Sequence, residues 1–73
     1  MVFIGREYRH YKGNKYKVIA IGKHSENLEE LVIYQALYGD NEIWCRPLSM
    51  WDEMVEINGI KVKRFELIEE NNG

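Results

Sequence analysis

Short runs of alternating apolar and polar residues, separated by turn residues, dominate this chain. The clearest pair is MVEI and IKVKRF, which flank Asn58-Gly59 within residues 54–65. Asn-Gly between two alternating runs is the strongest short-range signal for a β-hairpin. Its two-residue turn gathers the aliphatic residues on one face, which we expect to join the core. That face carries Val55, Ile57, Ile60 and Val62.

A second hairpin is predicted near the N-terminus, where residues 6–12 and 15–23 flank Gly13-Asn14. Glycine at the first central position suits a two-residue type II′ turn. That turn would place Tyr11 opposite Tyr16 and Lys12 opposite Lys15. We therefore expect one face of this hairpin to be cationic.

The segment LVIYQALY, residues 31–38, is rich in β-branched and aromatic residues and predicts a central strand. A turn at residues 39–41 would return the chain along residues 43–46, with Gln35, Trp44 and Arg46 on one face. Pro47 interrupts the ladder, and PLSMWDEM predicts one short helical turn, with Ser49 as its cap, that closes one end of the fold.

Six short strands with close turns in 73 residues indicate an all-β fold. We expect a small SH3-like, strongly bent antiparallel barrel of five to six strands, with the helical turn near residues 48–53. A chain of this length holds one hydrophobic core, so residues 1–68 are predicted to be a single domain. Residues 69–73 are acidic and polar, and we expect a disordered tail there.

Composition narrows the class of protein. A hydrophobic content of 45% argues against a disordered chain, and no apolar run reaches the roughly 20 residues that a membrane-spanning helix needs. Cys45 is the single cysteine and has no intramolecular disulfide partner. We expect it to be a buried thiol. With Arg6 so near the start, these features predict a cytoplasmic protein without membrane association.

Charge is distributed unevenly although the net charge is only −2. Residues 1–24 hold six Lys or Arg against one Glu, and the remainder holds four against eleven acids. Such an asymmetry indicates either an anion-binding surface or an acidic part that folds against the basic part and cancels it.

No catalytic, metal-binding or cofactor-binding motif emerges from the sequence. The glycines are isolated, so no phosphate-binding loop is present, and two histidines with one cysteine fall short of standard zinc spacings. We therefore assign no catalytic residue, no metal ligand and no cofactor. The enzymatic alternative is a small metal-dependent hydrolase in which His10 and His24 meet and recruit Glu26 or Asp40.

Four motifs occur in a fixed order: YRHYKGNKYKV at residues 8–18, HSE at 24–26, YQALYGD at 34–40 and WCRPLSMW at 44–51. This order resembles the bacterial domain-of-unknown-function family 1653, from about Gly5 to Phe65. Cys45 departs from the aliphatic residue that the resemblance leads us to expect. The resemblance implies a compact stand-alone bacterial domain and transfers no activity. It covers His10, Lys12, Gly13, His24, Glu26, Tyr34, Tyr38, Asp40, Trp44, Arg46 and Pro47.

A binding surface is the function that the residues favour. Tyrosines alternate with basic residues in YRHYKGNKYK, the composition that lets nucleobases stack while phosphates are neutralised. Around Arg46, aromatic side chains could wall a pocket in which the guanidinium holds a carboxylate or phosphate. The alternative role of Arg46 is an ion pair with Glu26 or Glu29 that closes the barrel.

We therefore expect a non-enzymatic module for an anionic ligand: a nucleotide, a nucleic acid or a small carboxylate. The low pI of about 5.6 weighs against a dedicated nucleic-acid-binding protein. The other alternative is a homodimer or protein-partner module that uses exposed sheet edges. The candidate ligand-binding residues are His10, Lys12, Tyr34, Trp44 and Arg46.

Overall fold

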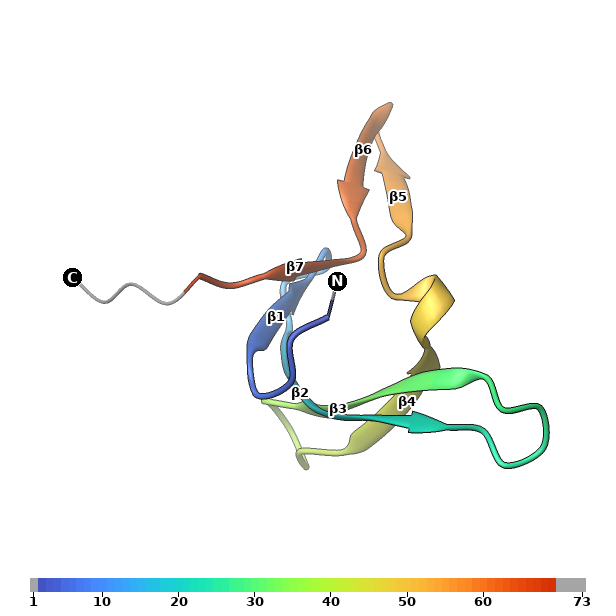
Figure 1. The fold of residues 1–73 in the computed structure, drawn as a ribbon. Helices are drawn as coiled ribbons and strands as arrows, with labels where there is room; N and C mark the ends of the chain where they lie inside the picture. Colours follow the sequence, from blue (N-terminus) through green and yellow to red (C-terminus); the bar gives the residue numbers. More distant parts are fainter. Residues whose placement is uncertain (1, 70–73) are drawn as a thin grey trace.

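The computed structural model describes residues 2–69, and β-strands account for nearly all of its regular structure. The elements are β1 (Glu7–His10), β2 (Lys15–Lys23), β3 (Glu30–Ala36), β4 (Ile43–Pro47), the 3₁₀ helix η1 (Leu48–Met50), β5 (Met54–Ile57), β6 (Ile60–Lys63) and β7 (Phe65–Leu67). Five strands form one antiparallel sheet in the order β4-β3-β2-β1-β7, and β5 and β6 form a separate hairpin (Figure 1). The all-β prediction is confirmed.

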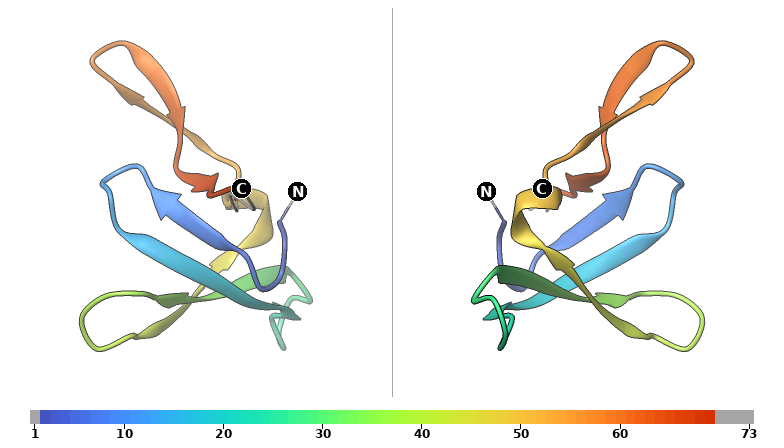
Figure 2. Two further views of the ribbon diagram at one scale, coloured as in Figure 1. Left: turned by 90° about the vertical axis from the view of Figure 1, so that its left-hand side faces the viewer. Right: turned by 90° about the vertical axis from the view of Figure 1, so that its right-hand side faces the viewer.

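The main sheet is strongly bent, as the two opposite side views show (Figure 2). The register between β2 and β3 shifts between Val18 and Ala20, which leaves Ile19 as an extra residue in β2. A bulge of this kind bends its strand and increases the local twist. The bend lets one sheet enclose a small core.

Trp51 lies at the centre of that core and has no exposed surface. Its ring stacks on Phe65 with centroids 4.0 Å apart and meets Tyr8 and Tyr34 edge to face at 5.3 and 5.2 Å. The predicted helical turn near residues 48–53 is present as η1. Trp51 follows η1 directly, so the turn positions this side chain in the core. Pro47, not Ser49, holds the N-cap position, and no side chain caps the turn.

The register of the first hairpin differs from the prediction by three residues. Tyr8 pairs with Tyr16 and Arg9 with Lys15, and the loop is longer than two residues. An odd shift exchanges the two faces of a strand. The observed register buries Tyr8 together with Val18 and leaves Arg9 outside, whereas the predicted one would have turned Arg9 inward. Burial of Tyr8 therefore outweighs the short turn. The outer face of the hairpin carries Arg9, Lys15 and Lys17 with Glu7, and the predicted pairing of Lys12 with Lys15 does not form.

The register of β3 with β4 also differs from the prediction by three residues. Tyr34 pairs with Trp44 and Val32 with Arg46, so Trp44 and Arg46 lie on the core-facing side of the sheet. Gln35 pairs with Ile43 and does not share their face, contrary to the prediction. Burial of Val32, Tyr34 and Ala36 decides this register.

Cys45, predicted to be buried, is exposed. It pairs with Ile33 on the outer face of the main sheet, away from the core. The register error explains this correction, because the position was expected to face the buried tyrosines.

The β5–β6 hairpin has the predicted register and turn. Val55 pairs with Val62, and Asn58 and Gly59 take φ values of 51° and 81°, as a type I′ turn requires. Its expected core role is wrong, however, because the hairpin stands away from the main sheet (Figures 1 and 2). Ile57 is 40% exposed and Ile60 66% exposed. The core instead closes with Phe65 and Leu67 of β7.

Residues 70–73 of the predicted tail 69–73 lie outside the described residues. Within residues 2–69, no helix is long and apolar enough to cross a membrane.

Candidate anion-binding site

Basic and aromatic side chains meet where β4 lies across the bent sheet from the paired strands β1 and β7. We call His10, Tyr11, Arg46, Arg64 and Phe65 the basic–aromatic cluster. His10 and Phe65 are cross-strand partners, and their ring centroids are 5.0 Å apart. The Arg46 Cζ lies 5.7 Å from the centroid of the same Phe65 ring. Phe65 therefore brings together an imidazole from β1 and a guanidinium from β4.

The cluster extends from His10 to Tyr11, whose ring centroids lie 4.4 Å apart. Two further cations border the Tyr11 ring, with the Arg64 Cζ 5.9 Å and the Lys12 Nζ 5.8 Å from its centroid. The backbone N–H of Tyr11 donates to the Arg64 carbonyl, which ties the β1–β2 loop to the residue before β7. Four cationic or ionisable groups thus border two aromatic rings.

Arg46 carries the strongest indication of a ligand. Its Nε is buried and has no hydrogen-bond partner among the described residues. No carboxylate within residues 2–69 forms an ion pair with it, so the suggested pairing with Glu26 or Glu29 is absent. Arg64 differs, because its Nη2 lies 3.5 Å from a Glu53 carboxylate oxygen. A half-buried guanidinium without an anion has unused hydrogen-bonding capacity.

The electrostatic environment of His10 is positive. Burial first, then the charges of Arg64, Lys12 and Arg46, lower the pKa of His10 below its usual 6.5. The Nδ1 atom accepts a hydrogen bond of 3.2 Å from the Lys12 backbone N–H. In the neutral imidazole the proton is then assigned to Nε2, which is left as a donor.

Tyrosines line the sheet beside the cluster. Tyr16 meets Phe65 and Tyr34 edge to face at 5.7 and 5.4 Å, and its hydroxyl lies 2.6 Å from that of Tyr38. Burial first, then the hydrogen bond with Tyr38, raises the pKa of Tyr16 to about 12. The Tyr16 hydroxyl therefore stays protonated near neutral pH and supplies a polar contact without charge.

The structure separates the five predicted ligand-binding residues into groups. His10 and Arg46 come together on Phe65, and Lys12 lies at the edge of the cluster. Trp44 shares the face of Arg46 and is 50% exposed. Tyr34 is only 8% exposed and packs against Trp51, beneath the cluster.

Three members of the cluster, Tyr11, Arg64 and Phe65, are not among the predicted ligand-binding residues. Tyr11 lies in the motif YRHYKGNKYK, whereas no local signal marks Arg64 and Phe65, because their position depends on the pairing of β7 with β1, strands more than 50 residues apart in the chain. Tyr16 and Tyr38 lay inside the motifs quoted above, but their contact depends on the register of β2 and β3.

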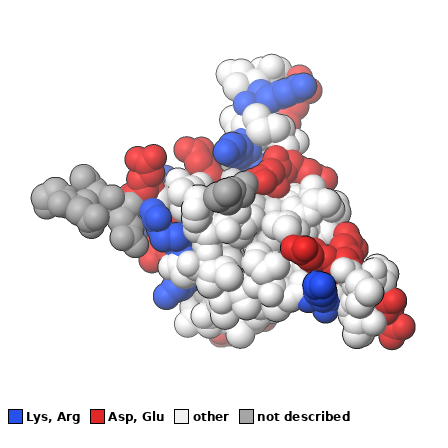
Figure 3. Space-filling model, in the orientation of Figure 1, with Lys and Arg blue, Asp and Glu red and all other residues white. Residues whose placement is uncertain are grey.

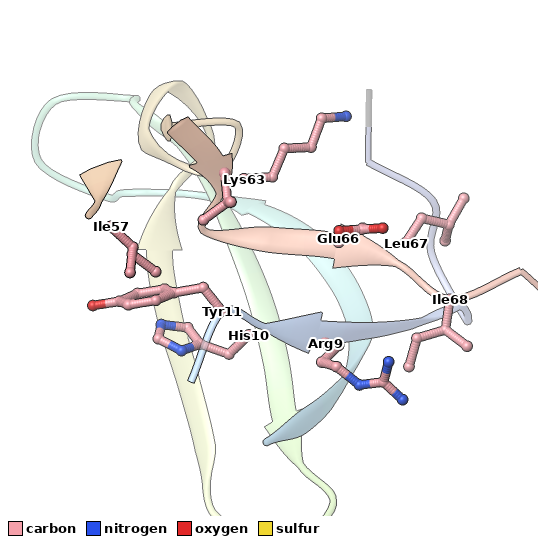
Figure 4. A pocket seen from close by; sticks show the side chains of 9 residues that line it. Arg9, His10, Tyr11, Ile57, Lys63, Glu66, Leu67 and Ile68 are labelled. Atoms are coloured by element: carbon pink, nitrogen blue, oxygen red, sulfur yellow. The ribbon is translucent and has the colours of Figure 1, made fainter. Parts of the chain in front are cut away.

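A cavity of about 330 Å³ lies between β1, β7 and the β5–β6 hairpin and adjoins the basic–aromatic cluster, because His10 and Tyr11 also line it (Figure 4). Ile57 and Val62 supply apolar walls, while Arg9, Lys63 and Glu66 supply charges of both signs. Its ionic groups can neutralise one another, so it offers a weaker case for an anion than Arg46 does.

On the face shown in Figure 3, Lys and Arg lie beside Asp and Glu around an uncharged centre. The overall charge asymmetry therefore does not produce a one-sided basic surface in this view. The local excess of cations around His10 is the feature that remains.

His24 lies in the exposed loop after β2, where its Nδ1 accepts the Glu26 backbone N–H at 3.1 Å. This hydrogen bond shapes the loop. Within residues 2–69, no group of three or more His, Cys, Asp or Glu side chains is arranged to hold a metal ion.

Comparison with known proteins agrees with the resemblance. No curated protein matches the chain. A crystal structure of a DUF1653 protein from Bordetella bronchiseptica is similar, with 29% sequence identity and a TM-score of 0.82, over 97% of this chain and 94% of that one. The family described as "Protein of unknown function (DUF1653)" matches residues 6–67. This chain therefore belongs to the DUF1653 family.

Proposed function

We propose that the protein is a non-enzymatic module that binds an anionic group at the basic–aromatic cluster. The observation that carries the proposal is the state of the Arg46 side chain. Its guanidinium lies over the Phe65 ring, its Nε is buried without a hydrogen-bond partner, and no carboxylate among the described residues forms an ion pair with it. Charge-assisted hydrogen bonds from arginine to carboxylate or phosphate are strong and often bidentate.

The surroundings of Arg46 support the same ligand class. His10 supplies an Nε2–H donor, and the charges that act on its ring are all positive. The Phe65 ring next to both groups reduces their contact with water, which strengthens electrostatic interactions. The cluster offers donors and apolar walls, which suits binding.

Titration of ¹⁵N-labelled protein with inorganic phosphate and with acetate tests this proposal. We expect saturable shifts of the amide signals of His10, Arg46 and Phe65 that weaken as ionic strength rises. Arg46→Gln should reduce the affinity at least tenfold. Lys17→Gln is the matched control, because Lys17 is an exposed cation on the outer face of the main sheet.

Equal losses from Arg46→Gln and Lys17→Gln would show only non-specific attraction and overturn the proposal. Arg9→Gln distinguishes binding in the 330 Å³ cavity, which Arg9 lines, from binding at Arg46. A loss confined to Arg9→Gln would move the site to that cavity.

The setting that we propose with this function is the bacterial cytoplasm. Cys45 is an exposed free thiol, which a reducing compartment preserves. The solved family member comes from Bordetella bronchiseptica.

A second candidate function is self-association, which the outer face of β3 and β4 favours. Ile43 is 62% exposed and Cys45 is exposed, and Ile33 lies beside them. β4 is also an edge of the main sheet. An uncharged patch can meet a second copy of itself across a two-fold axis without like-charge contact.

Light scattering coupled to size-exclusion chromatography tests this candidate function. We expect a mass that rises with concentration toward that of a dimer, and Ile43→Lys should keep the chain monomeric. A concentration-independent monomeric mass for the unmodified protein would exclude the dimer.

A further inference from the structure

The strand face that carries Arg46 continues to two exposed aromatic rings. Trp44 precedes Arg46 by two residues in β4, so the two side chains point to the same face with Cα atoms about 7 Å apart. Trp44 is 50% exposed, and Tyr38, in the loop between β3 and β4, is 43% exposed. Both rings are therefore available to a planar ligand.

A depression of about 220 Å³ lies between these two rings. This volume is below the usual range for a drug-sized ligand, and we infer that it suits a single ring system. Two carboxylates, Asp40 and Glu42, also line it, and no lysine or arginine does. The face is therefore polarised, with hydrogen-bond acceptors at the Trp44 end and cations at the Arg46 end.

We propose that the ligand is a nucleotide unit, with its phosphate at Arg46 and His10 and its base against Trp44. This inference rests on the proposed function and assigns the chemical class of the anion. The phosphate is directed to the Arg46 end because the carboxylates would repel it at the other end. The sugar bridges the two positions.

The carboxylates also select among bases. Guanine, adenine and cytosine carry amino groups that can donate hydrogen bonds to the carboxylates of Asp40 and Glu42. Uracil carries no amino group. Guanine presents a ring N–H beside its amino group and can donate two bonds to one carboxylate. We therefore expect guanosine monophosphate to bind most tightly and uridine monophosphate most weakly among the nucleotides.

The two indole N–H signals of ¹⁵N-labelled protein report on the ring position. Trp44 is half exposed, whereas Trp51 has no exposed surface. Titration with guanosine monophosphate should shift the Trp44 indole signal and leave that of Trp51 nearly unchanged. Ribose 5-phosphate and inorganic phosphate should shift the amide signal of Arg46 without moving the Trp44 indole.

Variants separate the two ends of the site. Trp44→Leu should weaken the binding of guanosine monophosphate about 5- to 150-fold, the contribution of one base–aromatic stack. The affinity for inorganic phosphate should remain unchanged. Trp44→Phe retains a ring and should recover most of the loss. Arg46→Gln should weaken the binding of both ligands. Asp40→Ala with Glu42→Ala removes both acceptors and should abolish the preference for guanosine over uridine monophosphate.

A free nucleotide and a nucleotide within a single strand share this chemistry. A guanosine-containing RNA tetramer distinguishes them. Tighter binding of the tetramer than of guanosine monophosphate would assign the unit to a strand, and equal binding would assign it to a free nucleotide. Both outcomes support the nucleotide unit.

The possible failures are distinguishable. If phosphate binds in an Arg46-dependent way but guanosine monophosphate binds no tighter and leaves the Trp44 indole unmoved, the nucleotide inference is overturned and the anion site stands. If no anion moves the signals of His10 and Arg46, both proposals are overturned.

Discussion

At the scale of single residues, Phe65 links the core to the candidate site. One neighbour of its ring is the buried Trp51, in parallel stacking at an interplanar angle of 4°, and others are His10 and Arg46. A substitution at Phe65 would therefore change stability and binding together. Arg46 is half-buried and outside the core, so its substitution tests binding separately.

The first prediction concerns the titration of His10. The pKa of His10 should lie below 6.5, because burial and three cationic neighbours disfavour the imidazolium. Arg46→Gln should raise it, and saturating phosphate should raise it too, because an anion favours the charged ring. Measurement of the His10 ring proton shifts against pH checks these directions.

The same group makes a contribution to pH-dependent stability. A folded pKa below the unfolded value means that the unfolded chain binds the proton more readily, so stability rises with pH in this range. The contribution is fully present above pH 6.5 and is lost as pH falls from there through the folded pKa of His10. In urea unfolding, His10→Gln should flatten this segment of the pH profile; an unaltered profile would contradict the assignment.

A second prediction at this scale concerns the Tyr16–Tyr38 hydroxyl pair. Tyr38→Phe removes the partner that helps to raise the pKa of Tyr16, so that pKa should fall below about 12. The free energy of unfolding should drop by about 1 kcal/mol, as for one hydrogen bond. Ultraviolet titration and urea unfolding measure the two effects, and Tyr11→Phe is the control for general loss of a hydroxyl.

At the scale of elements, the β5–β6 hairpin and the main sheet behave as different kinds of structure. The hairpin forms from local sequence, because Asn58 and Gly59 adopt the turn that they favour. It contributes no residue to the buried core cluster. An isolated two-stranded hairpin is marginally stable in water.

We therefore predict that β5 and β6 exchange amide protons much faster than β2 and β3 do. Ile60→Lys should change the free energy of unfolding by no more than about 0.5 kcal/mol, because Ile60 is 66% exposed. Hydrogen exchange followed by NMR and urea unfolding provide the measurements. Strong protection of β5 would indicate that the hairpin packs on the body or on a partner.

At the scale of the whole molecule, stability depends on one ring. A domain of this size rarely retains more than roughly 3 to 5 kcal/mol of net stability. Trp51 joins β1, β3 and β7 through its contacts with Tyr8, Tyr34 and Phe65. Few other contacts could compensate for its loss.

Trp51→Ala should cost about 3 to 5 kcal/mol and leave much of the chain unfolded. Trp51→Phe should retain the fold, because it keeps a ring and removes an indole N–H that has no hydrogen-bond partner among the described residues. Near-ultraviolet circular dichroism and urea unfolding check both variants. A folded Trp51→Ala protein would show that the core is distributed more widely than its contacts indicate.

Alternation, turn residues and length by themselves determined the all-β class, the approximate positions of β1 to β6, the β5–β6 register and the helical turn, because these features follow from contacts between near neighbours. Residue chemistry also selected His10 and Arg46 as candidate ligand-binding residues. The tertiary structure decided the registers of β1 with β2 and of β3 with β4, because burial of Tyr8 and Tyr34 outweighed turn preference. It also decided the cluster itself, since Arg46, His10 and Phe65 meet only when β7 pairs with β1 and the sheet bends, and contacts across so many residues leave no local pattern.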